Sequence, residues 1–395
     1  MIIKQMSNLF SCLFISLIII SQFSCGSDDP PIIEDTFISI SNDIDSPTTW
    51  TNQNDDPNDV DYKVLRSIDV NDVLTIEPGV RIEFESGVLM EVRDGALIAI
   101  GTAVDRIVFT GCESIKGFWS GILFRSDDIR NEMDFCDVSF GGDDELDANI
   151  SVDDFAGTEA ILKLTNSVIS NSLTNGLLVD DDATLSSFSN NVFSDNNGTP
   201  VVTSANSVHQ IDAISDFSDN NGFNGVEIME STLTTNVAVS WVKLGNESQY
   251  LISGDCELEA GLTIEAGCVF IMEPSVFFGV KRDGGYLIAE GTPTDRIVFD
   301  GLINDQPSWL GILFRSDDVR NILNYCTINA GGSDELSGNR TNISVDDFAG
   351  VAAVVTIQNC EITGSGGCGI FVDSDAELIE SNNVFANNVS DDICM

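Results

Sequence analysis

The sequence WSGILFRSDDIRN at residues 119–131 returns almost unchanged as WLGILFRSDDVRN at residues 309–321. Eleven of the thirteen positions are identical at an offset of 190 residues. A second string, NISVDDFAG, occurs at 149–157 and again at 342–350, where the offset has grown to 193. The three extra residues fall between the two strings and mark a loop there. The chain is therefore a tandem duplication, which is typical of repeat folds.

Short β-strands are predicted along both copies. Apolar and polar residues alternate with period two in stretches such as 74–76 and 80–84, and clusters of Gly, Asn and Asp separate these stretches. Helical periodicity is absent from the sequence. A β-sandwich would not explain a long tandem duplication that absorbed an inserted loop, whereas a solenoid of stacked coils would. The pattern therefore predicts an all-β fold, a parallel β-helix built from two tandem copies.

Four strings carry a more specific resemblance. The first copy reads TIEPGVRIEF, GALIAIGT, DRIVFTG and WSGILF, and the second reads TIEAGCVFIM, GGYLIAEGT, DRIVFDG and WLGILF. These strings resemble the right-handed parallel β-helix repeat proteins of the pectin-lyase-like superfold. The resemblance covers about residues 49–395 and implies a right-handed coil. It implies little about chemistry, since that fold hosts lyases, hydrolases, adhesins and non-catalytic surface proteins.

The N-terminal region has the features of an export signal. Residues 1–24 hold one charge and an apolar run, followed by Ser24 and Cys25. This ending resembles a lipobox, which implies lipidation at Cys25, although Gln22 and Phe23 depart from the usual pattern and leave ordinary signal-peptidase cleavage open. The acidic segment after Cys25 resembles the tether of surface lipoproteins of Bacteroidetes type.

These features predict the following organisation: signal peptide 1–24, acidic tether and linker 25–48, first copy 49–237 and second copy 238–395, the two copies being continuous. We expect an outer-membrane lipoprotein, exposed at the cell surface and held to the membrane only by its lipid. The oligomeric state is left open.

Charge restricts the partners of the chain. The formal net charge is −47 at pH 7, from 64 acidic and 17 basic residues. Nucleic acid and other polyanions are poor partners for such a surface. A neutral glycan, an extracellular matrix polymer or a cation suits it better.

Four cysteines have no counterpart in the first copy, where Ile68, Val80, Ser167 and Asn175 stand in the place of Cys256, Cys268, Cys360 and Cys368. Because the members of each pair were gained together in an exported chain, we predict the disulfides Cys256–Cys268 and Cys360–Cys368.

Two further cysteines, Cys136 and Cys326, are equivalent to each other in the two copies. Free cysteine behaves as a small apolar side chain. We therefore expect both residues to be buried and reduced.

Catalytic motifs are weak. A hydrolase of the polygalacturonase type would be expected to show N-T-D, an Asp-Asp pair, Gly-His-Gly and R-I-K, and the full set is absent. The single histidine, His209, lacks glycine neighbours and has no counterpart in the second copy. A lyase would need calcium ligands and a basic side chain such as Arg125 or Arg130, but both are expected to form ion pairs, with Asp127 and Asp128. Catalysis is therefore not predicted.

Acidic loops suggest calcium as a possible ligand, because hard oxygen donors are concentrated at equivalent places in both copies. The alternative is a solvated acidic face, since the sequence contains neither an EF-hand loop nor a nonapeptide calcium repeat. The candidate metal ligands are Asp143, Asp144, Glu145, Asp147, Asp153 and Asp154 in the first copy, and Asp334, Glu335, Asp346 and Asp347 in the second.

Strand parity predicts a binding face. If Ile122 and Phe124 face inward, then Trp119, Leu123 and Arg125 face outward. The equivalent residues of the second copy are Trp309, Leu313 and Arg315. If the 190-residue offset corresponds to a whole number of coils of about 22 residues, both sets are predicted to lie on one face.

An exposed tryptophan beside a cation can stack on sugars, whereas the alternative places Trp119 at a corner under a neighbouring loop. The sequence thus favours a non-catalytic binding or adhesion protein for glycan or matrix. A polysaccharide lyase or glycoside hydrolase on the same scaffold is the alternative.

Overall fold

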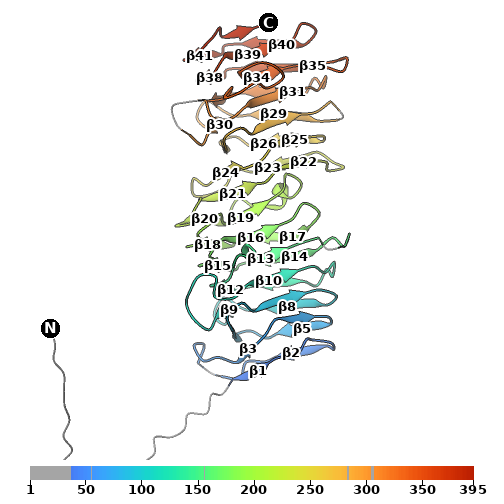
Figure 1. The fold of residues 1–395 in the computed structure, drawn as a ribbon, viewed down its shortest axis with the longest axis vertical. Coiled ribbons are helices and arrows are strands. Elements are labelled where there is room, and N and C mark those ends of the chain that lie inside the picture. Colours follow the sequence, from blue (N-terminus) through green and yellow to red (C-terminus); the bar gives the residue numbers. More distant parts are fainter. Residues whose placement is uncertain (1–36, 55, 155, 283, 304–306) are drawn as a thin grey trace, which may run out of the picture. The chain divides into compact units, whose positions relative to one another are not determined.

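The computed structural model describes residues 37–54, 56–154, 156–282, 284–303 and 307–395. The predicted signal peptide, Cys25 and the tether up to residue 36 lie outside the described residues. Residues 37–395 form one unit in which short strands stack coil upon coil, in chain order from β1 to β42 (Figure 1). This is a right-handed parallel β-helix, and the predicted fold class is confirmed.

Two sheets begin near the N-terminal end of the unit. An eight-stranded sheet contains β1 (Ile38–Ile40), β3 (Tyr62–Val64), β6 (Arg81–Phe84), β9 (Ile107–Gly111), β12 (Cys136–Ser139), β15 (Val168–Ser170), β18 (Val192–Ser194) and β20 (Asp216–Asp219). A six-stranded N-terminal sheet contains β2 (Thr48–Trp50), β5 (Val73–Ile76), β8 (Ala96–Ile100), β11 (Glu132–Asp134), β14 (Ile161–Thr165) and β17 (Thr184–Ser189).

A third sheet runs through both copies. It has 13 strands: β4 (Ile68–Val70), β7 (Leu89–Val92), β10 (Gly121–Phe124), β13 (Ala148–Val152), β16 (Asn175–Val179), β19 (Val201–Thr203), β21 (Gly225–Ile228), β24 (Gln249–Ile252), β27 (Val269–Met272), β30 (Ile297–Gly301), β33 (Cys326–Asn329), β38 (Glu361–Thr363) and β41 (Val384–Ala386).

Two more long sheets run through the second copy, and the first of them starts at β22, just before residue 238. A seven-stranded sheet contains β22 (Ser231–Leu233), β25 (Cys256–Leu258), β28 (Phe277–Val280), β31 (Gly311–Phe314), β34 (Thr341–Val345), β39 (Cys368–Val372) and β42 (Ile393–Cys394). A six-stranded C-terminal sheet contains β23 (Val239–Trp241), β26 (Gly261–Ile264), β29 (Tyr286–Glu290), β32 (Ile322–Asn324), β37 (Val354–Gln358) and β40 (Glu377–Ser381). The short strands β35 (Asp347–Phe348) and β36 (Val351–Ala352) pair antiparallel.

Helical structure is minimal. Within the described ranges the one helical element is the 3-10 helix η1 (Val208–Gln210). In this part of the chain no helix is long and apolar enough to cross a membrane.

The core is a continuous apolar column, because the long sheets are parallel and like side chains stack between coils. Ile122 of β10, for example, pairs with Met90 of β7 below and Ile150 of β13 above, and all three side chains are fully buried. Asparagines close many corners in the left-handed conformation, such as Asn166 and Asn190 with φ of 51° and 58°. Their side chains stack, since the Asn190 amide donates to the Asn166 carbonyl oxygen at 2.6 Å.

The β-helix begins before residue 49, which corrects the predicted linker 25–48. Strand β1 pairs with β3 in parallel, and Ile44 is buried in the core. The segment 37–48 had been assigned to the linker because of its polar composition. A strand that covers the first coil needs apolar side chains only at alternate positions, so a largely polar segment can still form it.

Equivalent strands of the two copies lie in different sheets, so the prediction that both binding sets share one face is wrong. Strand β10 lies in the 13-stranded sheet, whereas its counterpart β31 lies in the seven-stranded sheet. The 13-stranded sheet instead continues through β30 and β33, the counterparts of β9 and β12.

Variable coil length explains this shift of face. Tyr62 and Ile82 are partners only 20 residues apart, while Ile122 and Ile150 are 28 residues apart. A mean coil length therefore does not fix the face on which a distant residue lies.

Candidate functional site

Two grooves lie over the duplicated strands. The first groove, about 490 Å³ in volume, lies on the outer face of the 13-stranded sheet. Its lining residues are Leu89, Glu91, Leu123, Arg125, Glu145, Leu146, Asp147, Ser151, Asp153, Leu178, Asp180 and Met229. The second groove, about 220 Å³, lies on the seven-stranded sheet and is lined by Glu257, Glu259, Gly279, Val280, Lys281, Arg282, Leu313, Arg315 and Phe348.

A row of charged side chains follows the same register in each copy, one residue beyond the end of each strand. The backbone ladder continues into these rows, since Arg125 donates its N–H to Val92 O at 2.8 Å and Asp153 donates to Phe124 O at 2.9 Å. The first charged row is Arg93, Arg125, Asp153 and Asp180, and the second charged row is Lys281, Arg315, Asp346 and Asp373. Each row thus runs from two cations to two carboxylates.

The floor of each groove is a leucine. Leu123 pairs in register with Glu91 and Ser151, and it lies outside the central apolar cluster, as does Leu313 in the second copy. Both leucines therefore point outward, as predicted, yet each is only 4% exposed. The walls of the grooves cover them, so each leucine forms the bottom of a groove rather than part of an open face.

Arg125 is held by carboxylates on both sides. Its Nε and Nη2 donate to Asp153 Oδ2 at 3.0 and 2.8 Å, and Nη1 donates to Glu91 Oε1 at 3.3 Å. Burial alone would raise the pKa of Glu91, but hydrogen bonds and charge from Arg93 and Arg125 hold that pKa below its usual value. The predicted pairing of Arg125 with Asp127 is wrong, because the side chain projects along the sheet toward the neighbouring coils.

The predicted pairing of Arg130 with Asp128 is confirmed. The Arg130 side chain donates twice to that carboxylate, at 2.9 and 2.5 Å. Arg320 and Asp318 repeat the same contacts in the second copy.

Arg315 has different support in the second copy. Its Nε donates to Asp346 Oδ2 at 2.8 Å and its Nη2 donates to Ser337 Oγ at 2.6 Å. The ring of Phe348 lies 4.1 Å from the guanidinium carbon, in a cation–π contact, and this phenylalanine is 45% exposed. The second groove therefore offers an accessible aromatic surface next to a cation.

Asp153 and Asp180 form a carboxyl pair in the first groove. They follow the register partners Val152 and Val179, so they lie side by side on adjacent coils. Partial burial and a hydrogen bond shared with Asp153 raise the pKa of Asp180. The sequence analysis missed Asp180, although the string LLVD at 177–180 repeats the ISVD pattern of 150–153 and would have located it.

The predicted outward position of Trp119 and Trp309 is wrong. Both are fully buried, and their indole N–H groups donate to Ser139 O at 2.9 Å and to Asn329 O at 2.7 Å. Parity does not extend back to Trp119 because Gly121 has φ of 127°, which breaks the strand alternation.

A side chain at that position is also excluded. A Cβ on Gly121 would lie 2.7 Å from Asn149 O and 2.8 Å from Ala148 O. Glycine is therefore required there, and the alternative that placed the tryptophan at a covered corner is the better description.

The carboxylates proposed for calcium do not converge. Among the described residues, no group of three or more His, Cys, Asp or Glu side chains is arranged to hold a metal ion. The predicted ligands have other partners: Asp143 accepts from Ser120 Oγ at 2.7 Å, Asp154 from the Gly157 N–H at 3.2 Å, and Asp334 from the Glu335 N–H at 2.9 Å. The remaining candidates are spread along the loops (Asp144, Glu145, Asp147 and Glu335), lie on the short strand β35 (Asp347) or bind arginine (Asp153 and Asp346).

His209 lies apart from both grooves. It belongs to η1 and is exposed in a separate polar pocket of about 480 Å³, whose lining includes Asp154, Asp181 and Asp182. It has no place in the duplicated site.

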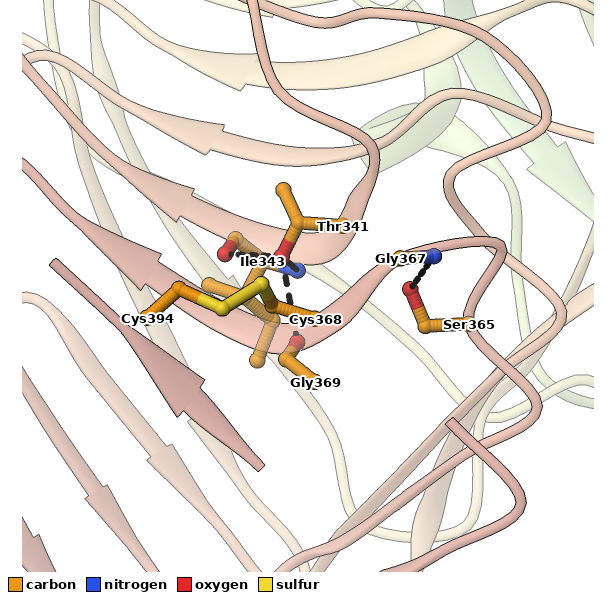
Figure 2. Close-up of a disulfide and its surroundings, with 7 residues drawn as sticks. All are labelled: Thr341, Ile343, Ser365, Gly367, Cys368, Gly369 and Cys394. Carbon is orange, nitrogen blue, oxygen red and sulfur yellow. Dashed lines mark hydrogen bonds between the residues drawn. A yellow bond between two sulfur atoms is a disulfide. The ribbon is translucent and has the colours of Figure 1, made fainter. Parts of the chain in front are cut away.

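Neither predicted disulfide forms. Cys256 and Cys268 are free, because Cys256 belongs to the seven-stranded sheet and Cys268 precedes β27 of the 13-stranded sheet. Cys360 and Cys368 flank a corner within one coil and face different sheets. The disulfide joins Cys368 to Cys394 of the next coil, with 6.0 Å between the Cα atoms (Figure 2).

The expected burial of Cys136 and Cys326 is confirmed. Both are free and fully buried in the structure.

Comparisons with known proteins add little about function. No protein-family model matches the chain, and no curated protein matches it. Among solved structures, the periplasmic alginate epimerase AlgG is similar over 82% of this chain and 76% of that chain, with 10% identity and a TM-score of 0.26. This likeness is too low to assign chemistry, so the functional argument rests on the grooves.

Proposed function

We propose that this chain is a surface lipoprotein that binds a neutral polysaccharide in the first and second grooves without cleaving it. The observation that carries the proposal is that both copies keep the outward-facing leucine, arginine, serine and aspartate of these strands, although the strands lie on different sheets.

The retained residues are not required by core packing. The pairs Leu123/Leu313, Arg125/Arg315, Ser151/Ser344 and Asp153/Asp346 are identical between copies, although they lie on different sheets. Several outward residues of other strands have changed, as in Asp137/Thr327, Glu132/Ile322 and Lys163/Thr356. An outward residue is less constrained by packing than an inward one. Retention at the grooves therefore favours a shared ligand.

The chemistry of the grooves suits a neutral sugar. Arg125 and Arg315 are paired with carboxylates at 2.8 Å, and Lys281 is paired with Glu257 and Glu259, so most of the positive charge in the grooves is compensated. Carboxylates fixed by arginine can accept hydrogen bonds from sugar hydroxyls. Phe348 supplies an aromatic face for the apolar side of a ring.

The carboxyl pair argues against a standard glycosidase. Paired catalytic carboxyls must both be free to act on the sugar or on a water, whereas Asp153 is bound to Arg125 at 2.8 Å. For the lyase alternative, Arg125 would have to act as a base while bound to Asp153 and Glu91. Binding therefore fits the geometry better than either reaction.

Surface attachment would come from a lipid on Cys25, which lies outside the described residues. Replacing Cys25 with Ser should release the protein from the membrane fraction. A variant that stays in that fraction with an unchanged mass would contradict the anchor, but it would leave the binding proposal untouched.

The binding test uses matched variants of the full chain. Leu123→Ser and Leu313→Ser remove the floor of one groove each, and we expect each to lower affinity at its own groove about tenfold. Because the grooves lie on different sheets, each single variant should halve the number of sites and leave the other groove unchanged.

The control is Asp137→Thr, which copies the residue of the second copy at an outward position away from the grooves. Glycan arrays with and without calcium, followed by calorimetry on any hit, measure the effect. Unchanged binding in the double leucine variant, with its fold intact, would refute the proposal.

One observation favours the enzymatic alternative. A raised carboxyl pKa, such as that of Asp180, is a feature of general acids. New reducing ends or unsaturated sugars released from a polysaccharide, and lost in Asp180→Asn, would replace binding by catalysis as the function of the first groove.

A further inference from the structure

Two free cysteines of the second copy face each other across adjacent coils. Strand β33 pairs with β38 through Thr327 and Glu361, and Cys326 and Cys360 immediately precede these partners. Both side chains are fully buried. Partners across a sheet stand about 4.8 Å apart, which lies inside the range of roughly 4.4–6.8 Å that a disulfide requires between Cα atoms.

The two cysteines directly precede register partners, so they lie side by side on adjacent coils. Each also lies near a backbone carbonyl, Cys326 at 3.4 Å from Ala289 O and Cys360 at 3.4 Å from Leu323 O. A hydrogen bond from the Cys326 thiol lowers the pKa of Cys360, whereas burial raises that of Cys326.

An arginine holds the two coils together at this point. Arg296 Nη2 donates to Cys326 O at 2.7 Å and to Asn359 O at 3.0 Å. Asn359 directly precedes Cys360 in the sequence, so one guanidinium fixes the backbone beside both cysteines.

The first copy provides a natural comparison. Ser167 stands where the second copy has Cys360, and its hydroxyl accepts from the Cys136 N–H at 3.0 Å and donates to Thr165 O at 2.8 Å. No bond between these side chains is possible there. The other cysteine gained in this coil, Cys368, is joined to Cys394 in the next coil. Both new cysteines thus face a cysteine on an adjacent coil.

We propose that Cys326 and Cys360 form a second inter-coil disulfide when the chain folds in the presence of a disulfide oxidant. The Cys360 thiolate attacks a sulfur of the small-molecule disulfide and releases one thiol. The Cys326 thiolate then attacks the Cys360 sulfur of this mixed disulfide and releases the second thiol. Two electrons and two protons pass to the oxidant. The bond is independent of glycan binding and goes beyond the proposed function.

The test refolds the full-length chain in a buffer of oxidised and reduced glutathione. Free thiols are then alkylated, and the peptides are mapped without reduction. We expect one linked pair containing Cys326 and Cys360 in addition to the Cys368–Cys394 pair. Cys136, which faces Ser167, should be alkylated in the same sample and serves as the internal control.

Cys360→Ser recreates the arrangement of the first copy and should fold. Compared with this variant, the oxidised wild type should have a thermal midpoint higher by about 5 °C. Alkylation of both Cys326 and Cys360 in a sample whose Cys368–Cys394 bond has formed would overturn the proposal, and so would Cys360 linked to any other cysteine.

Discussion

The first and second grooves contain equivalent arginines, Arg125 and Arg315, that are held by different neighbours. In the first copy, Arg125 lies between the carboxylates of Glu91 and Asp153. In the second copy, Gly279 stands at the position of Glu91, and Arg315 is held by Asp346, Ser337 and the ring of Phe348. The guanidinium has been kept while its supports changed. Its position in the groove, rather than one particular ion pair, is what the two copies share.

The largest expected difference between the copies comes from the buried tryptophans. Removing either indole leaves a cavity and an unpaired carbonyl, which costs about 3 to 5 kcal/mol. Trp119 also stacks on Phe84, with ring centroids 4.0 Å apart, whereas Trp309 has no stacked ring among the described residues. Trp119→Ala should therefore destabilise more than Trp309→Ala, by about 1 kcal/mol.

Urea unfolding followed by circular dichroism measures both tryptophan variants. An exposed tryptophan would cost almost nothing when truncated. A loss below about 1 kcal/mol in either variant would therefore restore the outward orientation that the sequence predicted.

The second comparison concerns how the two copies secure equivalent coils. Cys368 is joined to Cys394, while its counterpart Asn175 accepts from the Thr199 N–H at 2.8 Å and donates to Asp147 O at 3.1 Å. Cys394→Ser should cost about 3 kcal/mol, whereas Asn175→Ala should cost about 1 kcal/mol.

Hydrogen exchange locates the effect of each of these two variants. In Cys394→Ser the amides of β39 and β42 should exchange faster, with β7 and β10 unchanged as the control. Equal protection of β39 in the variant and in the wild type would mean that the disulfide does not secure the last coils.

Much of the fold could be predicted from short stretches of sequence, because strands and corners depend on neighbouring residues. Period-two alternation and asparagine turns determine strands and corners, and stacking of like on like then determines the column. The face on which each strand lies could not be predicted from the sequence. The coils differ in length, so a distant equivalent residue can fall on another sheet. The orientation predicted for Trp119 was wrong for a related reason. The positive φ of Gly121 interrupts the alternation of inward and outward side chains.

The candidate site was predictable in part. Leu123 and Arg125 were found through strand parity, and both line the first groove. The disulfides were not, because residue spacing does not show which face a cysteine occupies. Cys360 and Cys368 are eight residues apart in the sequence, yet each faces a neighbouring coil rather than the other.

The smallest expected effect is on the pH dependence of stability, which should have opposite directions for Asp180 and Asp128. Partial burial and the neighbouring Asp153 raise the pKa of Asp180, so the folded state binds its proton more tightly than the unfolded state does. The stabilisation is complete at acid pH and is lost as pH rises through the folded pKa. Asp128 is the opposite case, since the hydrogen bond from Arg130 lowers its pKa and its stabilisation is lost as pH falls.

Asp180→Asn should therefore leave stability unchanged near pH 3 and raise it at pH 7, by about 1 kcal/mol or less because solvent screens the pair. Asp128→Asn should lower stability at pH 7 and have little effect at acid pH. Urea midpoints at both pH values measure the two variants. A loss of stability at neutral pH in Asp180→Asn would mean that the ionised carboxylate is needed in the first groove, and the raised pKa of Asp180 would be wrong.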